Sequence, residues 1–282
     1  MAKTVFEAYN NCKKQLKNAG IEDYVFESKQ IIKHITGLDN VGILNNPYKV
    51  LSEFEENNLT VIIKQRSIHY PLQYILGEWE FYGNKFFVGP GALIPRQDTE
   101  TLVTTALNLS ENIKKMKVLD LCAGTGCIGI SIAKKRKDAS VLMLEKYDTA
   151  LYFANKNIQY HAAHNAVAVK GDIFGGDFSD RKFDLIVSNP PYLNLREMKQ
   201  LQAEVAFEPK EALAGGKRGL EFYKAILDNY ITSLNNGGII CFEVGATQGL
   251  EVAKMLKSYY LRHVSIVKDS AGKHRVVFGT YV

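Results

Sequence analysis

The stretch Asn189-Pro190-Pro191-Tyr192 carries the most specific chemical signal in the chain. It follows 184–188, whose residues after Asp184 are apolar or small and therefore predict a buried parallel strand. Neither proline can donate a hydrogen bond to a neighbouring strand, so we expect the strand to end at Asn189. Ligands of open α/β sheets bind outside the carboxyl ends of the strands, which predicts a site at this point.

The prolines also define the chemistry of that site. They remove two N–H donors, which leaves the Pro190 carbonyl and the Asn189 side chain as acceptors facing one small volume. A cluster of acceptors without a Ser, Cys or His nucleophile beside it suits a substrate –NH2 group, and Tyr192 would offer a flat face to a planar substrate. Taken alone, the four residues are equally compatible with an ordinary strand exit.

A second group of residues predicts a nucleoside-containing cofactor. Asp120, Gly124 and Gly126 lie at a strand-turn-helix junction, and Glu145 ends the next predicted strand. Glycine lets the backbone approach a ligand, and the acid can accept hydrogen bonds from ribose hydroxyls. Such a turn also suits a nicotinamide dinucleotide or close helix packing, but polar residues closing the third and fourth strands favour S-adenosyl-L-methionine. The predicted cofactor-binding residues are Asp120, Cys122, Ala123, Gly124, Thr125, Gly126, Glu145, Asp172, Ile173 and Asn189.

Composition narrows the class of protein. Apolar residues make up 46% and charged residues 23%, as in a globular protein, and no apolar run is long enough to span a membrane. The N-terminus lacks the apolar core of a secretory signal, so we expect a cytoplasmic protein. The four cysteines contain no C-x-x-C pair, and His161 and His164 share the spacing of one helix face but lack a third ligand, so no metal site is expected. A net charge of +5 does not require a nucleic-acid partner.

The elements that must position these residues follow from hydrophobic spacing. Helical patterns over 4–19, 24–35 and 50–68 predict a small bundle in residues 1–72, which we expect to recognise the substrate. Aromatic runs around Gly83-Asn84 predict a β-hairpin within a linker, residues 73–98. Asp98 or Thr99 is expected to cap the next helix, beside Arg96, which would hold an anion or order a loop. Alternating strands and helices from Lys117 predict a mostly parallel sheet in a catalytic domain, residues 99–282, closed by an antiparallel pair.

Several stretches together resemble the HemK/PrmC family of protein-(glutamine-N5) methyltransferases. The resemblance implies a class I S-adenosylmethionine-dependent methyltransferase: an α/β fold with a Rossmann-like, mostly parallel sheet, a C-terminal antiparallel hairpin and an N-terminal helical bundle. It implies methylation of the glutamine in the Gly-Gly-Gln motif of class 1 peptide chain release factors, by a monomer that needs neither nucleic acid nor membrane. It also implies that Tyr192 and Phe87 pack against the glutamine. The matching stretches are 71–77, 81–83, Leu93-Ile94-Pro95-Arg96-Gln97-Asp98-Thr99-Glu100, Asp120-Leu121 with Gly124 and Gly126, Asn189-Pro190-Pro191-Tyr192, and 208–216.

The chain departs from the family pattern at four positions. Cys122 stands at a usual glycine, Glu145 at a usual aspartate, Gln97 at a common proline, and Arg218 where an acid is common. We expect these departures to change the affinity for the cofactor or the substrate more than the type of reaction. Asn-Pro-Pro-Tyr also resembles adenine-N6 and guanine-N2 nucleic-acid methyltransferases, although the chain lacks a strong charge excess or a recognisable base-reading domain. A non-catalytic nucleotide-binding module is a third interpretation, which the intact Asn-Pro-Pro-Tyr stretch disfavours.

Overall fold

A computed structural model describes residues 3–175 and 180–282. The chain forms two compact units, one of residues 1–77 with 202–207, the other of residues 78–201 with 208–282. The first unit extends past residue 72, the expected end of the helical bundle. Residues 72–76 form a short helix that belongs to this unit. No helix in the described part of the chain is long and apolar enough to cross a membrane.

The first unit is a helical bundle whose helices begin at side-chain caps. Thr4 and Glu7 form a reciprocal capping box at the first helix, and Ser52 and Glu55 form another at the fourth. Ser52 explains why the predicted third helix begins at 53 rather than 50. The third and fifth helices were not predicted, because a helix of five or six residues is too short to show a periodic pattern of apolar residues. The helices are α1 (Val5–Asn18), α2 (Tyr24–Thr36), α3 (Asn40–Asn45), α4 (Glu53–Ser67) and α5 (Leu72–Leu76).

A buried arginine joins the segment 202–207 to this bundle. The Arg66 side chain is 1% exposed, and it donates to both carboxylate oxygens of Glu27, at 2.6 and 2.9 Å. It also pairs with Glu204, and the rings of Tyr70 and Phe207 lie 5.3 Å apart. Residues 202–207, which are distant in sequence, thus pack against the helical bundle and complete the first unit.

The second unit begins with the predicted β-hairpin, formed by β1 (Glu78–Phe81) and β2 (Asn84–Phe87). Its two-residue turn is Tyr82-Gly83, one residue earlier than expected, and both residues have positive φ, at 52° and 67°. Such turns match the twist of paired strands, and glycine lowers their conformational cost.

The second unit is built around a seven-stranded sheet of order β5-β4-β3-β6-β7-β9-β8. Its first five strands are parallel, and β9 pairs antiparallel with both β7 and β8, as predicted. The strands are β3 (Lys117–Leu121), β4 (Ser140–Glu145), β5 (Ala166–Lys170), β6 (Phe183–Ser188), β7 (Leu234–Glu243), β8 (Arg262–Lys268) and β9 (His274–Thr280).

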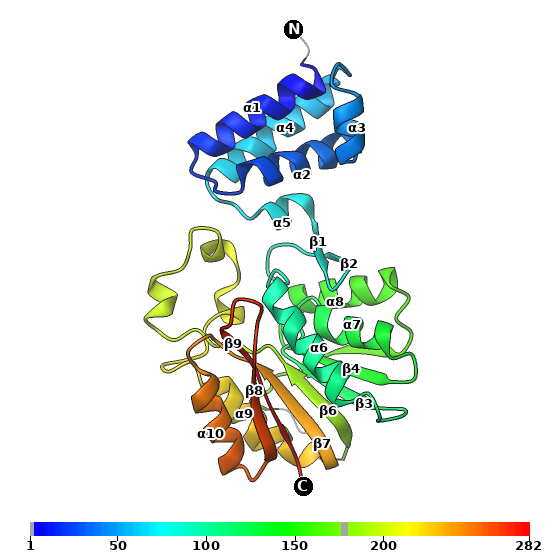
Figure 1. The fold of residues 1–282 in the computed structure, drawn as a ribbon, viewed down its shortest axis with the longest axis vertical. Coiled ribbons are helices and arrows are strands. Elements are labelled where there is room, and N and C mark those ends of the chain that lie inside the picture. Colours follow the sequence, from blue (N-terminus) through cyan, green and yellow to red (C-terminus); the bar gives the residue numbers. More distant parts are fainter. Residues whose placement is uncertain (1–2, 176–179) are drawn as a thin grey trace. The chain divides into compact units, whose positions relative to one another are not determined.

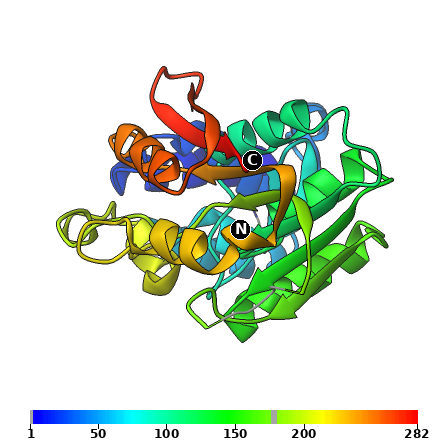
Figure 2. The same cartoon turned by 90° about the horizontal axis from the view of Figure 1, so that it is seen from below.

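Helices cover both faces of this sheet (Figures 1 and 2). Alternation along β3 sends Val118 into the core shared with α6 (Glu100–Leu109) and α7 (Cys127–Lys135), and Leu119 into the core shared with α9 (Glu221–Tyr230) and α10 (Gly249–Ser258). The helix α8 (Asp148–Tyr160), which the sequence analysis did not anticipate, packs against β4, β5 and α7.

Three local expectations need correction. Thr99 occupies the N-cap position of α6, as expected, but its side chain makes no capping hydrogen bond. Asp98 lies in a 3-10 turn, η1 (Gln97–Thr99), and pairs with Arg275, at 2.8 Å. The alternating pattern also predicts a helix from about Leu220 to Leu234, but this helix, α9, ends at Tyr230, where a 3-10 turn leads into β7. His161 caps the C-terminus of α8, and Ala162 has φ +47°, so His161 and His164 do not share a helix face.

Candidate active site

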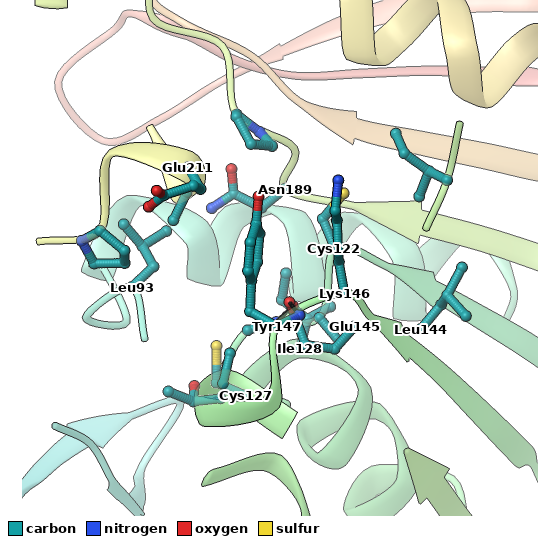
Figure 3. A pocket seen from close by; sticks show the side chains of 18 of the residues that line it. Leu93, Cys122, Cys127, Ile128, Leu144, Glu145, Lys146, Tyr147, Asn189 and Glu211 are labelled. Carbon is teal, nitrogen blue, oxygen red and sulfur yellow. Dashed lines mark hydrogen bonds between the residues drawn. The ribbon is translucent and has the colours of Figure 1, made fainter. Parts of the chain in front are cut away.

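A cavity of about 950 Å³, open solvent included, lies where parallel strands of the second unit end (Figure 3). The residues that follow β3, β5 and β6 (Cys122, Gly171 and Asn189) line it, as does Glu145, the last residue of β4. The structure therefore has a cavity at the carboxyl edge of the sheet, where the sequence predicts a site.

The turn between β3 and α7 forms the floor of the cavity. Cys122, Gly124 and Gly126 all have positive φ, at 60°, 57° and 76°. A Cβ on Gly124 would meet no atom within 4 Å, so this backbone stands open to a ligand, whereas one on Gly126 would contact Ile130 at 3.0 Å. The two glycines thus serve different purposes, ligand approach at Gly124 and helix packing at Gly126.

Asp120 supports this turn from beneath. It is fully buried, and its Oδ2 accepts a hydrogen bond from the Gly129 N–H at 2.9 Å, which fixes α7 on β3. Loss of solvation raises the pKa of Asp120 to about 8. The side chain does not reach the cavity wall.

Glu145 is the buried acid of the cavity. Its Oε2 accepts from the Gly124 N–H at 2.8 Å and its Oε1 from the Tyr147 N–H at 2.9 Å. Burial raises its pKa, although these backbone N–H groups oppose the rise. Each carboxylate oxygen keeps a further lone pair, so Glu145 fits the hydroxyls of a ribose. Beside it, Lys146 and Asp172 form an ion pair at 2.7 Å.

Asn189 follows β6 and lines the cavity near Cys122, which follows the neighbouring strand β3 (Figure 3). The preceding Ser188 hydroxyl donates to the Leu121 carbonyl at 2.6 Å, which ties β6 to β3. The Asn189 Nδ2 donates to the Thr99 hydroxyl at 3.3 Å. Its Oδ1 has no hydrogen-bond partner among the described residues, so it is available to a ligand.

The remaining predicted substrate residues have different surroundings. Tyr192 packs against the core shared with α9 and α10, and its carbonyl accepts from Gln248 at 2.9 Å. The Phe87 ring packs on Tyr160, 5.0 Å between centroids. Neither side chain lines the cavity. The predicted residues that line it are Cys122, Ala123, Gly124, Thr125, Glu145, Asp172, Ile173, Asn189 and Pro191, whereas Asp120, Gly126, Pro190, Tyr192 and Phe87 do not.

The cavity also contains residues that the sequence analysis missed. Tyr147 follows Glu145 by two positions, and its place just beyond a strand end was a usable signal. Thr99 was considered only as a helix cap. Leu93, Glu211 and Phe222 come from distant segments, and no spacing rule connects them with the turn.

Two ion pairs show what the side chains of Arg96 and Arg218 contact. Arg96 pairs with Glu208, whose other carboxylate oxygen accepts from the Ile94 N–H at 3.0 Å, so Arg96 orders a loop, the second of its expected roles. Arg218 pairs with Glu251 on α10, which supplies the contact that its departure from the pattern left unexplained. Within residues 3–175 and 180–282, no group of three His, Cys, Asp or Glu side chains could hold a metal ion.

The sheet order, the glycine turn and the acid at the end of β4 define a class I S-adenosylmethionine-dependent methyltransferase. A family model described as "Methyltransferase small domain" matches residues 97–217, and one described as "PrmC N-terminal domain" matches residues 7–77. The catalytic domain of hMettl16, solved in complex with an RNA hairpin, has the same fold, with a TM-score of 0.57 at 16% identity over 85% of each chain.

Curated relatives identify the family. A release factor glutamine methyltransferase of Clostridium botulinum is 37% identical over 93% of this chain and 94% of its own. One of Vibrio cholerae is 32% identical over 100% of this chain and 98% of its own. The chain belongs to the release factor glutamine methyltransferase family.

Proposed function

We propose that this enzyme transfers a methyl group from S-adenosylmethionine to the side-chain amide nitrogen, N5, of the glutamine in the Gly-Gly-Gln motif of class 1 release factors. Its relatives carry the name of that activity over nearly the whole chain. The observation that carries the proposal is the free Oδ1 of Asn189 in the same cavity as Glu145. An acceptor placed there suits an amide –NH2 group as methyl acceptor.

The cavity has the donor and acceptor set that S-adenosylmethionine needs. Glu145 would accept from the ribose hydroxyls, the open backbone at Gly124 would allow close approach, and Asp172 would accept from the adenine amino group. When bound, the cofactor supplies a methyl group activated on a sulfonium. The acidic side chains at the wall favour that positive charge.

Asn189 and Pro190 would orient the acceptor. An amide nitrogen is a poor nucleophile, because its lone pair is delocalised into the carbonyl. The Asn189 Oδ1 and the Pro190 carbonyl would accept both N–H bonds, which aligns the nitrogen and stabilises positive charge developing on it. Pro190, Tyr192 and Phe87 all lie outside the cavity wall, so we assign the principal polar contact to the Asn189 Oδ1, and the second to the carbonyl of the next residue, Pro190.

Methyl transfer from radiolabelled S-adenosylmethionine tests this assignment. We expect label in a purified class 1 release factor, and none in a release factor whose motif glutamine is replaced, in RNA or in DNA. Asn189→Ala should lower transfer by at least about a hundredfold, since it removes an electrostatic contact to the reacting group. Calorimetry should show S-adenosylmethionine binding reduced only severalfold. Full activity in Asn189→Ala, or label in nucleic acid alone, would contradict the assignment.

We further propose that the helical unit recognises the release factor, and that the enzyme acts in the cytoplasm as a monomer without a nucleic-acid cofactor. The family model that covers residues 7–77 supports a role specific to this family for the bundle. Sedimentation at working concentration tests the oligomeric state, and a dimer mass would contradict it.

A further inference from the structure

The Asn-Pro-Pro-Tyr stretch is held at its Tyr192 end by a side chain from another part of the chain. Gln248, at the N-cap position of α10, is only 9% exposed. Its Nε2 donates to the Tyr192 carbonyl at 2.9 Å and to the Gly219 carbonyl at 3.2 Å. Its Oε1 accepts from the Gly245 N–H at 3.1 Å. Both ends of the amide are therefore engaged, which fixes its orientation.

Two glycines pack directly against the same stretch. A Cβ on Gly219 would lie 2.2 Å from the Tyr192 oxygen, and one on Gly215 would lie 2.6 Å from the Pro191 oxygen. Both of these closest atoms belong to the backbone, so neither position has room for a side chain. Gly219 also has φ +75°, a conformation that suits glycine. The backbone from Pro191 to Tyr192 is thus in close contact with distant segments.

The sheet holds the other end of the stretch. Ser188 on β6 is paired with Leu121 on β3, and its hydroxyl donates to the Leu121 carbonyl at 2.6 Å. Between Ser188 and Tyr192, the two prolines keep φ at about −65°. A short, stiff segment that is held at both ends cannot rotate freely. The directions of the Asn189 side chain and of the Pro190 carbonyl therefore depend on the contacts at both ends.

The cofactor groups do not depend on Gln248 in this way. Gln248 does not line the cavity, and the residues assigned to S-adenosylmethionine belong to other segments. Glu145 ends β4, and Gly124 and Asp172 follow β3 and β5. Loss of the Gln248 hydrogen bonds should therefore disturb the groups that bind the methyl acceptor and leave the cofactor groups in place.

On the basis of the function proposed above, we propose that Gln248 is a positioning residue for methyl transfer. Through the Tyr192 carbonyl, it holds the backbone of the Asn-Pro-Pro-Tyr stretch so that Asn189 and Pro190 can accept from the substrate amide. Gln248 acts through these residues and does not touch the reacting atoms. Its effect is on the rate constant kcat rather than on cofactor binding, because misplaced groups align the reacting nitrogen poorly.

Steady-state kinetics on full-length variants with a purified class 1 release factor test this role. Gln248→Met keeps the length of the side chain but removes its three hydrogen bonds. We expect kcat to fall by about tenfold or more, with the Kd for S-adenosylmethionine within about twofold of the wild-type value. Gly219→Ala crowds the Tyr192 carbonyl and the Gln248 amide, and should give the same split between kcat and Kd.

Gln248→Glu separates the two ends of the amide. A carboxylate keeps the acceptor for the Gly245 N–H but cannot donate to the Tyr192 carbonyl. If positioning depends on that carbonyl, Gln248→Glu should lose kcat as Gln248→Met does. Wild-type kcat in Gln248→Glu would show that Gln248 only orders the start of α10, and would overturn the positioning role.

Asn165→Leu is the matched control for loss of stability. The Asn165 Nδ2 donates, at 3.0 to 3.2 Å, to the carbonyls of Ala133, Arg136 and Ala139. None of these residues lines the cavity. Like Gln248→Met, this change replaces an amide that bonds three backbone groups with an apolar side chain of similar length. We expect it to lower Tm by a comparable amount and to leave kcat unchanged.

The outcomes separate the positioning role from the proposed function. Wild-type kcat in Gln248→Met, or an equally low kcat in Asn165→Leu, would overturn the positioning role and leave the proposed function intact. If Gln248→Met does not fold, Gly219→Ala and Gln248→Glu decide by the same measurements. Absence of transfer by the wild-type enzyme would overturn the proposed function, and the positioning role with it.

Discussion

At the scale of single residues, the cavity floor contains one strained position. Cys122 has φ +60°, a conformation that L side chains adopt at a cost and that glycine adopts freely. Its thiol is partly buried beside Glu145, and burial raises the pKa of that thiol, so Cys122 is not poised as a thiolate. The cysteine therefore adds backbone strain without an evident chemical role.

We predict that Cys122→Gly stabilises the protein by about 1 kcal/mol, because it relieves the positive φ. For a unit of this size the increase corresponds to about 2–4 °C in Tm. Cys122→Ala is the matched control, since it removes the thiol but keeps the Cβ and hence the strain, and should give no gain. Thermal unfolding followed by circular dichroism measures the Tm of both variants. Equal Tm values would show that the positive φ of residue 122 does not destabilise the protein.

At the scale of elements, one buried side chain connects the hairpin, the cofactor turn and α8. Asn157 is fully buried, and its Oδ1 accepts from the Phe87 N–H at 2.7 Å. Its Nδ2 donates to the carbonyls of Phe87 and Thr125, both at 3.0 Å. A single amide thus satisfies backbone groups on β2 and on the turn between β3 and α7.

We predict that Asn157→Ala lowers the free energy of unfolding by about 3 kcal/mol, because three backbone groups lose their partner. It should also weaken S-adenosylmethionine binding, since Thr125 lies in the cavity wall. Asn155→Ala on the exposed face of the same helix, where the side chain bonds only to Leu151, is the control, with an expected change within about 0.5 kcal/mol. Urea denaturation checks the pair, and similar midpoints would contradict the role of Asn157.

At the scale of the whole molecule, the chain leaves the second unit at 202 and returns at 208, and residues 202–207 pack with the helical bundle. Arg66 holds this segment through Glu204 and the bundle through Glu27. The two ion pairs differ in surroundings: the Glu27 side chain is 11% exposed and that of Glu204 is 42% exposed. They should therefore differ in energy.

We predict that Arg66→Met costs about 3–5 kcal/mol of bundle stability, because it leaves Glu27 as a buried charge without its partner. Glu204→Gln should cost less than about 1 kcal/mol, because water screens that pair. Urea titration with limited proteolysis measures both. Equal costs would show that the segment 202–207, rather than the buried Glu27 pair, stabilises the bundle.

Local pattern was sufficient for much of the fold. The apolar runs at β3, β4 and β6 and the stop at Pro190-Pro191 follow from a few neighbouring residues, so they were predicted within about two positions. The helix α8 was not predicted, because its buried residues, Ala150, Ala154 and Asn157, are small or polar and give only a weak apolar period. Thr99 occupies the expected N-cap position of α6, but its hydroxyl accepts from Asn189, a partner ninety residues away, instead of from the helix backbone.

The sequence by itself determined the order of the strands, the glycine turn, the acid of β4 and the acceptor-rich exit from β6, because each depends on residues close together in the chain. Only the tertiary structure decided which of them share a cavity: it kept Glu145 and Asn189 there, placed Tyr192 and Phe87 elsewhere, and added Tyr147 and Thr99. The direction in which a side chain points, and the partner that satisfies it, depend on packing between segments far apart in sequence, which no local spacing encodes.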